Sequence, residues 1–145
     1  MTRCSGGEYM AQDYKDLLVW KKAMDLTTCV YQLSRRLPAD ELYGLRSQMR
    51  RASVSIASNI AEGRGRLNLA EFRQFLGLAQ GSTYELQTQL LVAKNLGLAN
   101  QEMLEQAESL SNEVSKMLSS FIHTLNSAAG KKKLGARSWE LEARS

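Results

Sequence analysis

The chain has 145 residues, of which 43% are hydrophobic and 23% are charged, and its formal net charge at pH 7 is +4. This length fits one domain with a real core, and the composition excludes global disorder. The mild positive charge permits a polyanionic partner without requiring one. A single proline and a modest content of β-branched residues favour helices over strands.

The N-terminal segment, residues 1–12, contains Gly6-Gly7 and shows little hydrophobic periodicity, so we expect a flexible leader. It lacks the apolar run of a signal peptide, and nowhere does the sequence hold the long apolar run of a membrane span. We therefore expect a cytoplasmic protein without a membrane partner.

Helical spacing of apolar residues predicts the first two helices. The first runs from about Asp16 to near Leu37. The second is expected to begin with Asp40 as its cap, to run to about Glu62 and to stop at the glycines of "EGRG", residues 62–65.

Two asparagines predict the starts of the last two helices. Asn68, with Glu71 three residues later, resembles a capping box and predicts a third helix that ends at Gly97. Asn100 is expected to cap a fourth helix, which fades near Asn126.

Four long helices with short connections predict an all-α, antiparallel up-down-up-down four-helix bundle. The expected bundle spans residues 13–127, and residues 128–145, with lysines at 131–133, are expected to form a basic mobile tail. The aromatic residues expected at the surface and the small-residue faces exceed what one small bundle needs to bury. Symmetric self-association, closing into a ring, is therefore expected.

The second helix carries an apolar stripe and, beside it, polar residues at steps of three and four. We predict a structural polar layer between the second and third helices, in which charges are mutually satisfied and fix the register of the two helices. Small residues, including Gly77, Gly81 and Ser82, are expected to let these helices approach closely. The polar layer comprises Arg51, Asn59, Glu62 and Glu85.

Glu62 and Glu85, together with Asn59, are compatible with acid–base chemistry, but the usual catalytic partners are missing. His123 is alone on the fourth helix, and Cys4 and Cys29 have no metal-site spacing. We favour a structural role for these residues and expect neither a catalytic residue, a cofactor nor a metal. Cys29 is expected to be a buried small apolar residue.

The segment "EGRGR" raises the possibility of a phosphate loop. Its glycines follow a helix, however, whereas both a P-loop and a dinucleotide site require them after a strand. Through residues 46–73 there are six arginines against two acids, which predicts a basic face able to bind phosphates; a merely solvated face is the alternative. The predicted nucleic-acid contacts are Arg46, Arg50, Arg64, Arg66, Arg73, Lys131, Lys132 and Lys133.

Three aromatic residues could stack on bases: Trp20 and Tyr31 in the first helix, and Tyr43 before the second. Their spacing among leucines and methionines favours core or subunit contacts instead.

Two motifs carry a family resemblance: R-R-A-x-x-S-I-x-x-N-I-A-E-G, from Arg50 to Gly63, and G-S-x-x-E-L, from Gly81 to Leu86. With the surrounding helices, over about residues 14–126, they resemble the four-helix-bundle proteins encoded within intervening sequences of bacterial 23S rRNA genes. The resemblance implies a cytosolic ring, typically a homopentamer, with no enzymatic activity attached. The architecture is also similar to the accessory proteins of diversity-generating retroelements, which bind nucleic acid and a reverse transcriptase.

These observations lead to two hypotheses for function. The first is a non-catalytic homo-oligomer, a pentamer by the resemblance, that binds RNA or DNA without strong sequence specificity. The alternative is a protein-interaction scaffold or accessory subunit, for example for a reverse transcriptase.

Overall fold

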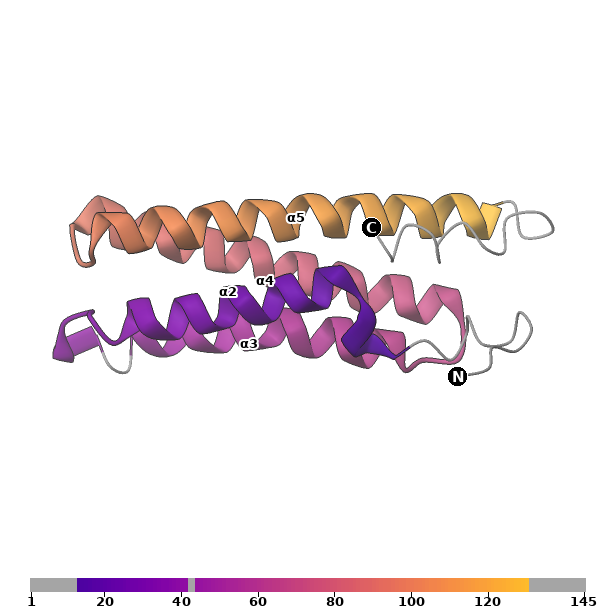
Figure 1. The fold of residues 1–145 in the computed structure, drawn as a ribbon, viewed down its shortest axis with the longest axis horizontal. Helices are drawn as coiled ribbons and strands as arrows, with labels where there is room; N and C mark the ends of the chain where they lie inside the picture. Colours follow the sequence, from indigo (N-terminus) through magenta and orange to yellow (C-terminus); the bar gives the residue numbers. More distant parts are fainter. Residues whose placement is uncertain (1–12, 42–43, 131–145) are drawn as a thin grey trace.

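The computed structural model describes residues 13–41 and 44–130 (Figure 1). Within these ranges the regular structure is helical and contains no strand, which confirms the predicted all-α fold. Short 3₁₀ turns, η1 (Tyr14–Asp16) and η2 (Ala39–Glu41), precede the first and second long helices. The long helices are α2 (Leu18–Ser34), α3 (Leu45–Arg64), α4 (Leu69–Leu96) and α5 (Gln101–Gly130).

The four long helices lie side by side, and the start of α2 and the end of α5 are at the same end of the bundle (Figure 1). The main contacts are those of α2 with α3, α3 with α4, α4 with α5, and α5 with α2. The predicted up-down-up-down bundle is therefore confirmed, while its assembly into a ring stays a prediction. In the described part of the chain, no helix combines the length and apolarity needed to cross a membrane.

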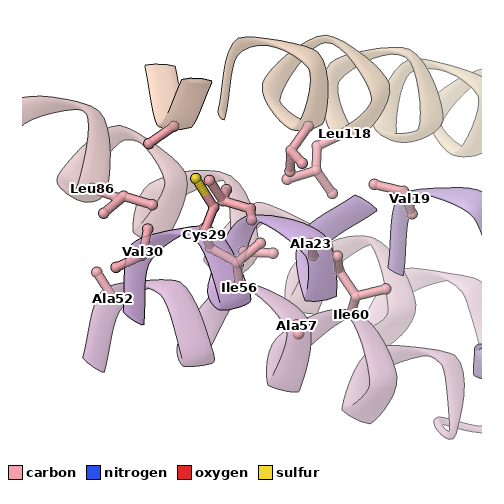
Figure 2. Packing of buried hydrophobic residues seen from close by; sticks show 14 of the residues in the cluster. Val19, Ala23, Cys29, Val30, Ala52, Ile56, Ala57, Ile60, Leu86 and Leu118 are labelled. Carbon is pink, nitrogen blue, oxygen red and sulfur yellow. The ribbon is translucent and has the colours of Figure 1, made fainter. Parts of the chain in front are cut away.

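The bundle is held together by one apolar core to which all four helices contribute. On α3 the predicted apolar stripe is confirmed, since Met49, Ile56 and Ile60 are fully buried. Figure 2 shows Ile56 of α3, Leu86 of α4 and Leu118 of α5 pointing into the same interior. Burial of such side chains from water is the main force that holds the helices together.

Local capping chemistry sets the ends of α4 and the start of α5. The side chain of Asn68 accepts a hydrogen bond from the backbone N–H of Glu71 at 2.9 Å. Gly97 ends α4 in the left-handed conformation, with φ of 64°. Asn100 accepts from the backbone N–H of Met103 at 3.0 Å. All three predicted helix ends are confirmed.

The start of α3 differs from the prediction. Asp40 does not cap this helix but lies in the η2 turn. The helix begins instead at Leu45, whose backbone N–H donates to Oε1 of Glu41 at 3.1 Å. The carboxylate therefore satisfies one of the free amide groups at the helix start, as a capping side chain does.

The end of α5 also differs, because the helix continues past Asn126 to Gly130. Leu125 and Ala128 are both buried. They lie three residues apart, so the core-facing side of the helix extends into its last turn.

Three of the glycines have positions or contacts that differ from those predicted. Gly65 is the C-cap of α3, as expected, but Gly63 lies inside the helix and is buried. A Cβ on Gly63 would lie 2.6 Å from Cβ of Phe75, so this glycine lets α3 and α4 approach closely. At Gly77 and Gly81, both exposed, a Cβ would meet nothing within 4 Å. The prediction that these two meet α3 is wrong.

Candidate nucleic-acid interface

Two of the predicted phosphate-binding arginines hold the end of α2 against the start of α3. Nη2 of Arg46 donates to the carbonyl oxygen of Leu37 at 2.7 Å. Nε of Arg50 donates to Oγ of Ser34, also at 2.7 Å. The Arg50 guanidinium lies 4.8 Å from the ring centroid of Tyr31, a cation–π contact. Both arginines are half-buried, and their positions are fixed by residues of α2 and of the loop that follows it.

Two further arginines, Arg35 and Arg36, directly follow α2 and are exposed. The predicted nucleic-acid contacts did not include these two arginines, although an Arg-Arg pair at a helix C-terminus can be recognised in a sequence. Within residues 35–50 there are four arginines and two acids. One of the acids, Glu41, already accepts a backbone hydrogen bond. We call Arg35, Arg36, Arg46 and Arg50 the basic end.

At the opposite end of α3, Arg64 is buried, whereas the sequence predicted that it would be exposed to solvent. Only 8% of this residue is exposed, and its guanidinium lies 5.9 Å from the ring centroid of Phe72. The prediction ended the helix at Gly63, so that Arg64 would extend into solvent beyond the helix end. Because the helix continues through Gly63, Arg64 remains on a turn that packs on α4.

Arg66 is exposed but its charge is compensated. Its Nη2 lies 3.0 Å from Oε2 of Glu62, and its Nε lies 3.9 Å from Oε1 of Glu71. The guanidinium also lies 4.6 Å from the ring centroid of Phe75. With two carboxylates beside it, Arg66 is a weaker phosphate ligand than the sequence suggests.

The remaining predicted contacts fall in two places. Arg73, on α4, is half-buried. Lys131, Lys132 and Lys133 lie outside the described residues. Of the predicted nucleic-acid contacts, the basic end therefore contains only Arg46 and Arg50.

The predicted polar layer is wrong as a buried set of charges. Arg51, Glu62 and Glu85 are all exposed, and Glu62 is paired with Arg66 rather than with Arg51 or Glu85. Exposed charges keep their hydration, which avoids the large cost of burying ions.

Short polar side chains make the actual link between α3 and α4. Oγ of Ser55 lies 2.9 Å from Oγ of Ser82, at hydrogen-bond distance across the two helices. Nδ2 of Asn59 donates to the carbonyl oxygen and to Oγ of Ser55, at 2.9 and 3.0 Å. Of the predicted layer, only Asn59 belongs to this set, and its contacts are with neutral groups. The predicted approach of Ser82 to α3 is confirmed.

The aromatic residues of α2 make contacts within the chain. Trp20 packs edge-to-face on Tyr14, with ring centroids 5.2 Å apart, and Tyr31 lies under Arg50. These contacts agree with packing rather than base stacking. Tyr43 lies outside the described residues.

Cysteine, histidine and carboxylate side chains are the candidate reactive or metal-binding groups in the sequence. Burial raises the pKa of the Cys29 thiol, which keeps it protonated and unreactive. Cys29 is thus the buried apolar residue that was predicted, whereas Cys4 lies outside the described ranges. His123 is exposed on α5. Across residues 13–41 and 44–130, no three His, Cys, Asp or Glu side chains are placed to hold a metal ion.

Comparison with known proteins gives a match to a family model and matches to solved structures. Residues 15–120 match the family model described as 23S rRNA-intervening sequence protein. The chain is also similar to the solved structure of a protein of unknown function from the S23 ribosomal protein family, from Bacteroides thetaiotaomicron VPI-5482. These two chains share 24% identity with a TM-score of 0.67, and the match covers 72% of this chain and 98% of that one. The similarity to this solved structure shows a common fold. No curated protein matches.

Proposed function

Because the chain belongs to the 23S rRNA-intervening sequence protein family, we propose that it is a non-catalytic, homo-oligomeric bundle that binds RNA or DNA. The observation that supports this function is the basic end, where two exposed arginines lie beside two that are held in place. The resemblance of the sequence to ring-forming bundles favours a pentamer. In a ring, several weak basic ends would act together on one polyanion.

The held arginines keep enough donors for phosphate. A guanidinium has five N–H donors, and the bond to Ser34 uses only the Nε donor of Arg50. Its two terminal nitrogens remain able to bind a phosphate in a bidentate manner. Fixing the side chain on Tyr31 lowers the entropy lost when phosphate binds. Such contacts neutralise the backbone and carry little base specificity.

Binding to a structured RNA and to duplex DNA, measured by fluorescence anisotropy, tests the proposal. Four phosphate contacts predict binding roughly 100-fold weaker at 200 mM salt than at 50 mM. The variant Arg35→Glu/Arg36→Glu should bind at least ~10-fold more weakly than the wild type at 50 mM salt.

The matched control is Lys21→Glu/Lys116→Glu, which makes the same change in net charge at exposed positions on α2 and α5. It should retain most of the affinity, because neither lysine belongs to the basic end. No binding at 50 mM salt, no salt dependence, or equal losses in the two double variants would each refute a site at the basic end.

A protein-interaction scaffold is the second candidate function, and the exposed apolar residues of α4 favour it. Leu78, Leu91 and Leu96 are 53%, 51% and 63% exposed. Exposed apolar groups of this kind mark protein contacts, either with a second copy of this chain or with a different protein. Purification of the native complex before and after nuclease treatment separates the two functions. A stoichiometric protein partner such as a reverse transcriptase, retained after nuclease, supports the scaffold; a partner lost with the nucleic acid supports nucleic-acid binding.

A further inference from the structure

The outer face of α4 presents large apolar side chains that nothing in the described chain covers. Five of them are at least 40% exposed. Gly77 and Gly81 lie on the same face, where a Cβ would meet nothing within 4 Å. Glycine destabilises a helix relative to alanine, so packing within this chain gives no reason for two of them here. A neighbour that approaches from outside would supply one. The apolar residues are Leu78, Tyr84, Leu91, Val92 and Leu96.

A second apolar surface is the groove between α2 and α3. Its volume is about 310 Å³. Met24 and Val54, one from each helix, are 42% and 41% exposed in it. The other α3 residues in its wall include Ala57 and Ala61, whose small side chains leave room for the ridge of another helix. The edge-to-face pair of Tyr14 and Trp20 also lines the groove.

Opposite charges lie beside the two surfaces. Arg51 is exposed one turn before Val54 on α3, next to the groove. Glu85 is exposed one turn after Gly81, on the outer face of α4. Neither side chain forms an ion pair within the described residues. Charges of opposite sign on two apolar surfaces favour contact between the surfaces and set its register.

We propose that the outer face of α4 in one copy of this chain packs into the α2–α3 groove of the next copy, with Glu85 facing Arg51 across the contact. This inference rests on the homo-oligomer of the proposed function and identifies the surfaces that make it. Because the two surfaces differ, the contact is head-to-tail, and repetition closes a ring or extends a filament. A symmetric pairing of two α4 faces would leave the groove empty and bring two copies of Glu85 close together.

Charge reversal at each position tests the contact, with light scattering and sedimentation at micromolar concentration as measurements. Arg51→Glu and Glu85→Arg should each raise the dissociation constant of assembly at least ~10-fold, with unchanged helicity by circular dichroism. The double variant Arg51→Glu/Glu85→Arg should assemble as the wild type does, because every contact then joins opposite charges again. The control Lys116→Glu, on α5, should also assemble normally.

Mixing the two single variants distinguishes a contact between copies from one within a chain. In the mixture, contacts that join opposite charges form between the two variants but not within either one, so mixed assemblies should return. An even-membered assembly or a filament then has only such contacts, whereas a five-membered ring retains one contact between like charges. If the double variant assembles but the mixture does not, the two charges act within one chain and the inference is wrong. It is also wrong if the single variants assemble as well as the wild type.

The same measurements separate this inference from the proposed function. A wild type that stays monomeric overturns the homo-oligomer itself, whereas a wild type that assembles beside indifferent variants overturns only these surfaces. The variant Arg35→Glu/Arg36→Glu tests nucleic-acid binding and changes neither of the two apolar surfaces, so the proposed function is tested separately.

Discussion

Replacing Gly63 by alanine should destabilise the protein, although alanine is the better helix former. Inside a helix the change stabilises by about 1 kcal/mol through the backbone alone. Against this gain, the new Cβ would lie 2.6 Å from Cβ of Phe75 and 3.1 and 3.3 Å from Cδ1 and the carbonyl oxygen of Phe72. Ordinary contacts between carbons are about 3.5–4.0 Å, so α4 must move by about 1 Å.

The overlap cannot be relieved cheaply, because Cβ of Phe75 and the Phe72 carbonyl are fixed to the α4 backbone. A shift of α4 also strains the hydrogen bond of 2.9 Å between Ser55 and Ser82. Overpacking typically costs about 1–3 kcal/mol, and the upper end applies to a rigid neighbour. After the helix gain, the free energy of unfolding should fall by about 2 kcal/mol, which lowers Tm by roughly 6 °C.

Urea denaturation and thermal melting at one protein concentration measure this effect, with Gly65→Ala as the matched control. A Cβ on Gly65 meets only two carbonyl oxygens, the nearer at 3.5 Å, and the backbone there is right-handed with φ of −81°. The control should therefore be neutral or stabilising by up to about 1 kcal/mol. If Gly63→Ala is as stable as Gly65→Ala, the close approach of α3 and α4 at this residue is refuted.

Three further changes test other parts of the fold. Asn68→Ala removes the N-cap of α4 and should lower the free energy of unfolding by about 1 kcal/mol in urea denaturation, whereas an unchanged midpoint would contradict the cap. Phe121→Ala empties a buried site beside Phe72, with ring centroids 5.3 Å apart, and should cost about 3–5 kcal/mol by the same measurement; a loss below about 1 kcal/mol would count against this packing. Because burial raises the pKa of Cys29 above its ordinary value of 9.0, the folded state holds a proton that the unfolded chain releases, and stability should fall as the pH rises above 9.0. Thermal melts from pH 8 to about 10 should show a shallower fall of Tm with pH in Cys29→Ala than in the wild type. Equal slopes of Tm against pH in the two proteins would contradict this role of Cys29.

Features that depend on neighbouring residues in the sequence were predictable. Asn68 and Gly97 were placed correctly at the ends of α4, because a cap is made by a side chain and backbone within one turn. The buried stripe of α3 was also predictable, since helical spacing alone puts Met49, Ile56 and Ile60 on one side.

Features that depend on the distance between helices were not predictable. Gly63 and Gly81 are both glycines in helical stretches, but of these two only Gly63 lies where another helix of the same chain approaches. The roles of the arginines could not be separated either. Arg46 bonds to a residue nine positions away and Arg50 to one sixteen away, and only the fold brings these partners together. Sequence spacing shows which residues share a face, but not how near the next helix lies.

The motif from Arg50 to Gly63 therefore contains several residues that fix the packing of α3 on its neighbours. Arg50 ties α3 to Ser34 of α2. Ser55, Asn59 and Gly63 follow at steps of four, so they lie along one side of the helix, where Ser55 bonds across to α4 and Gly63 lets it approach. The spacing between three helices is thus set by one short segment. Because Arg50 also belongs to the basic end, the residue that positions α2 on α3 would hold that end in the shape that is proposed to bind phosphate. Arg50→Lys keeps the charge but loses the planar guanidinium, so it should weaken both stability and nucleic-acid binding, whereas Arg35→Lys should weaken neither.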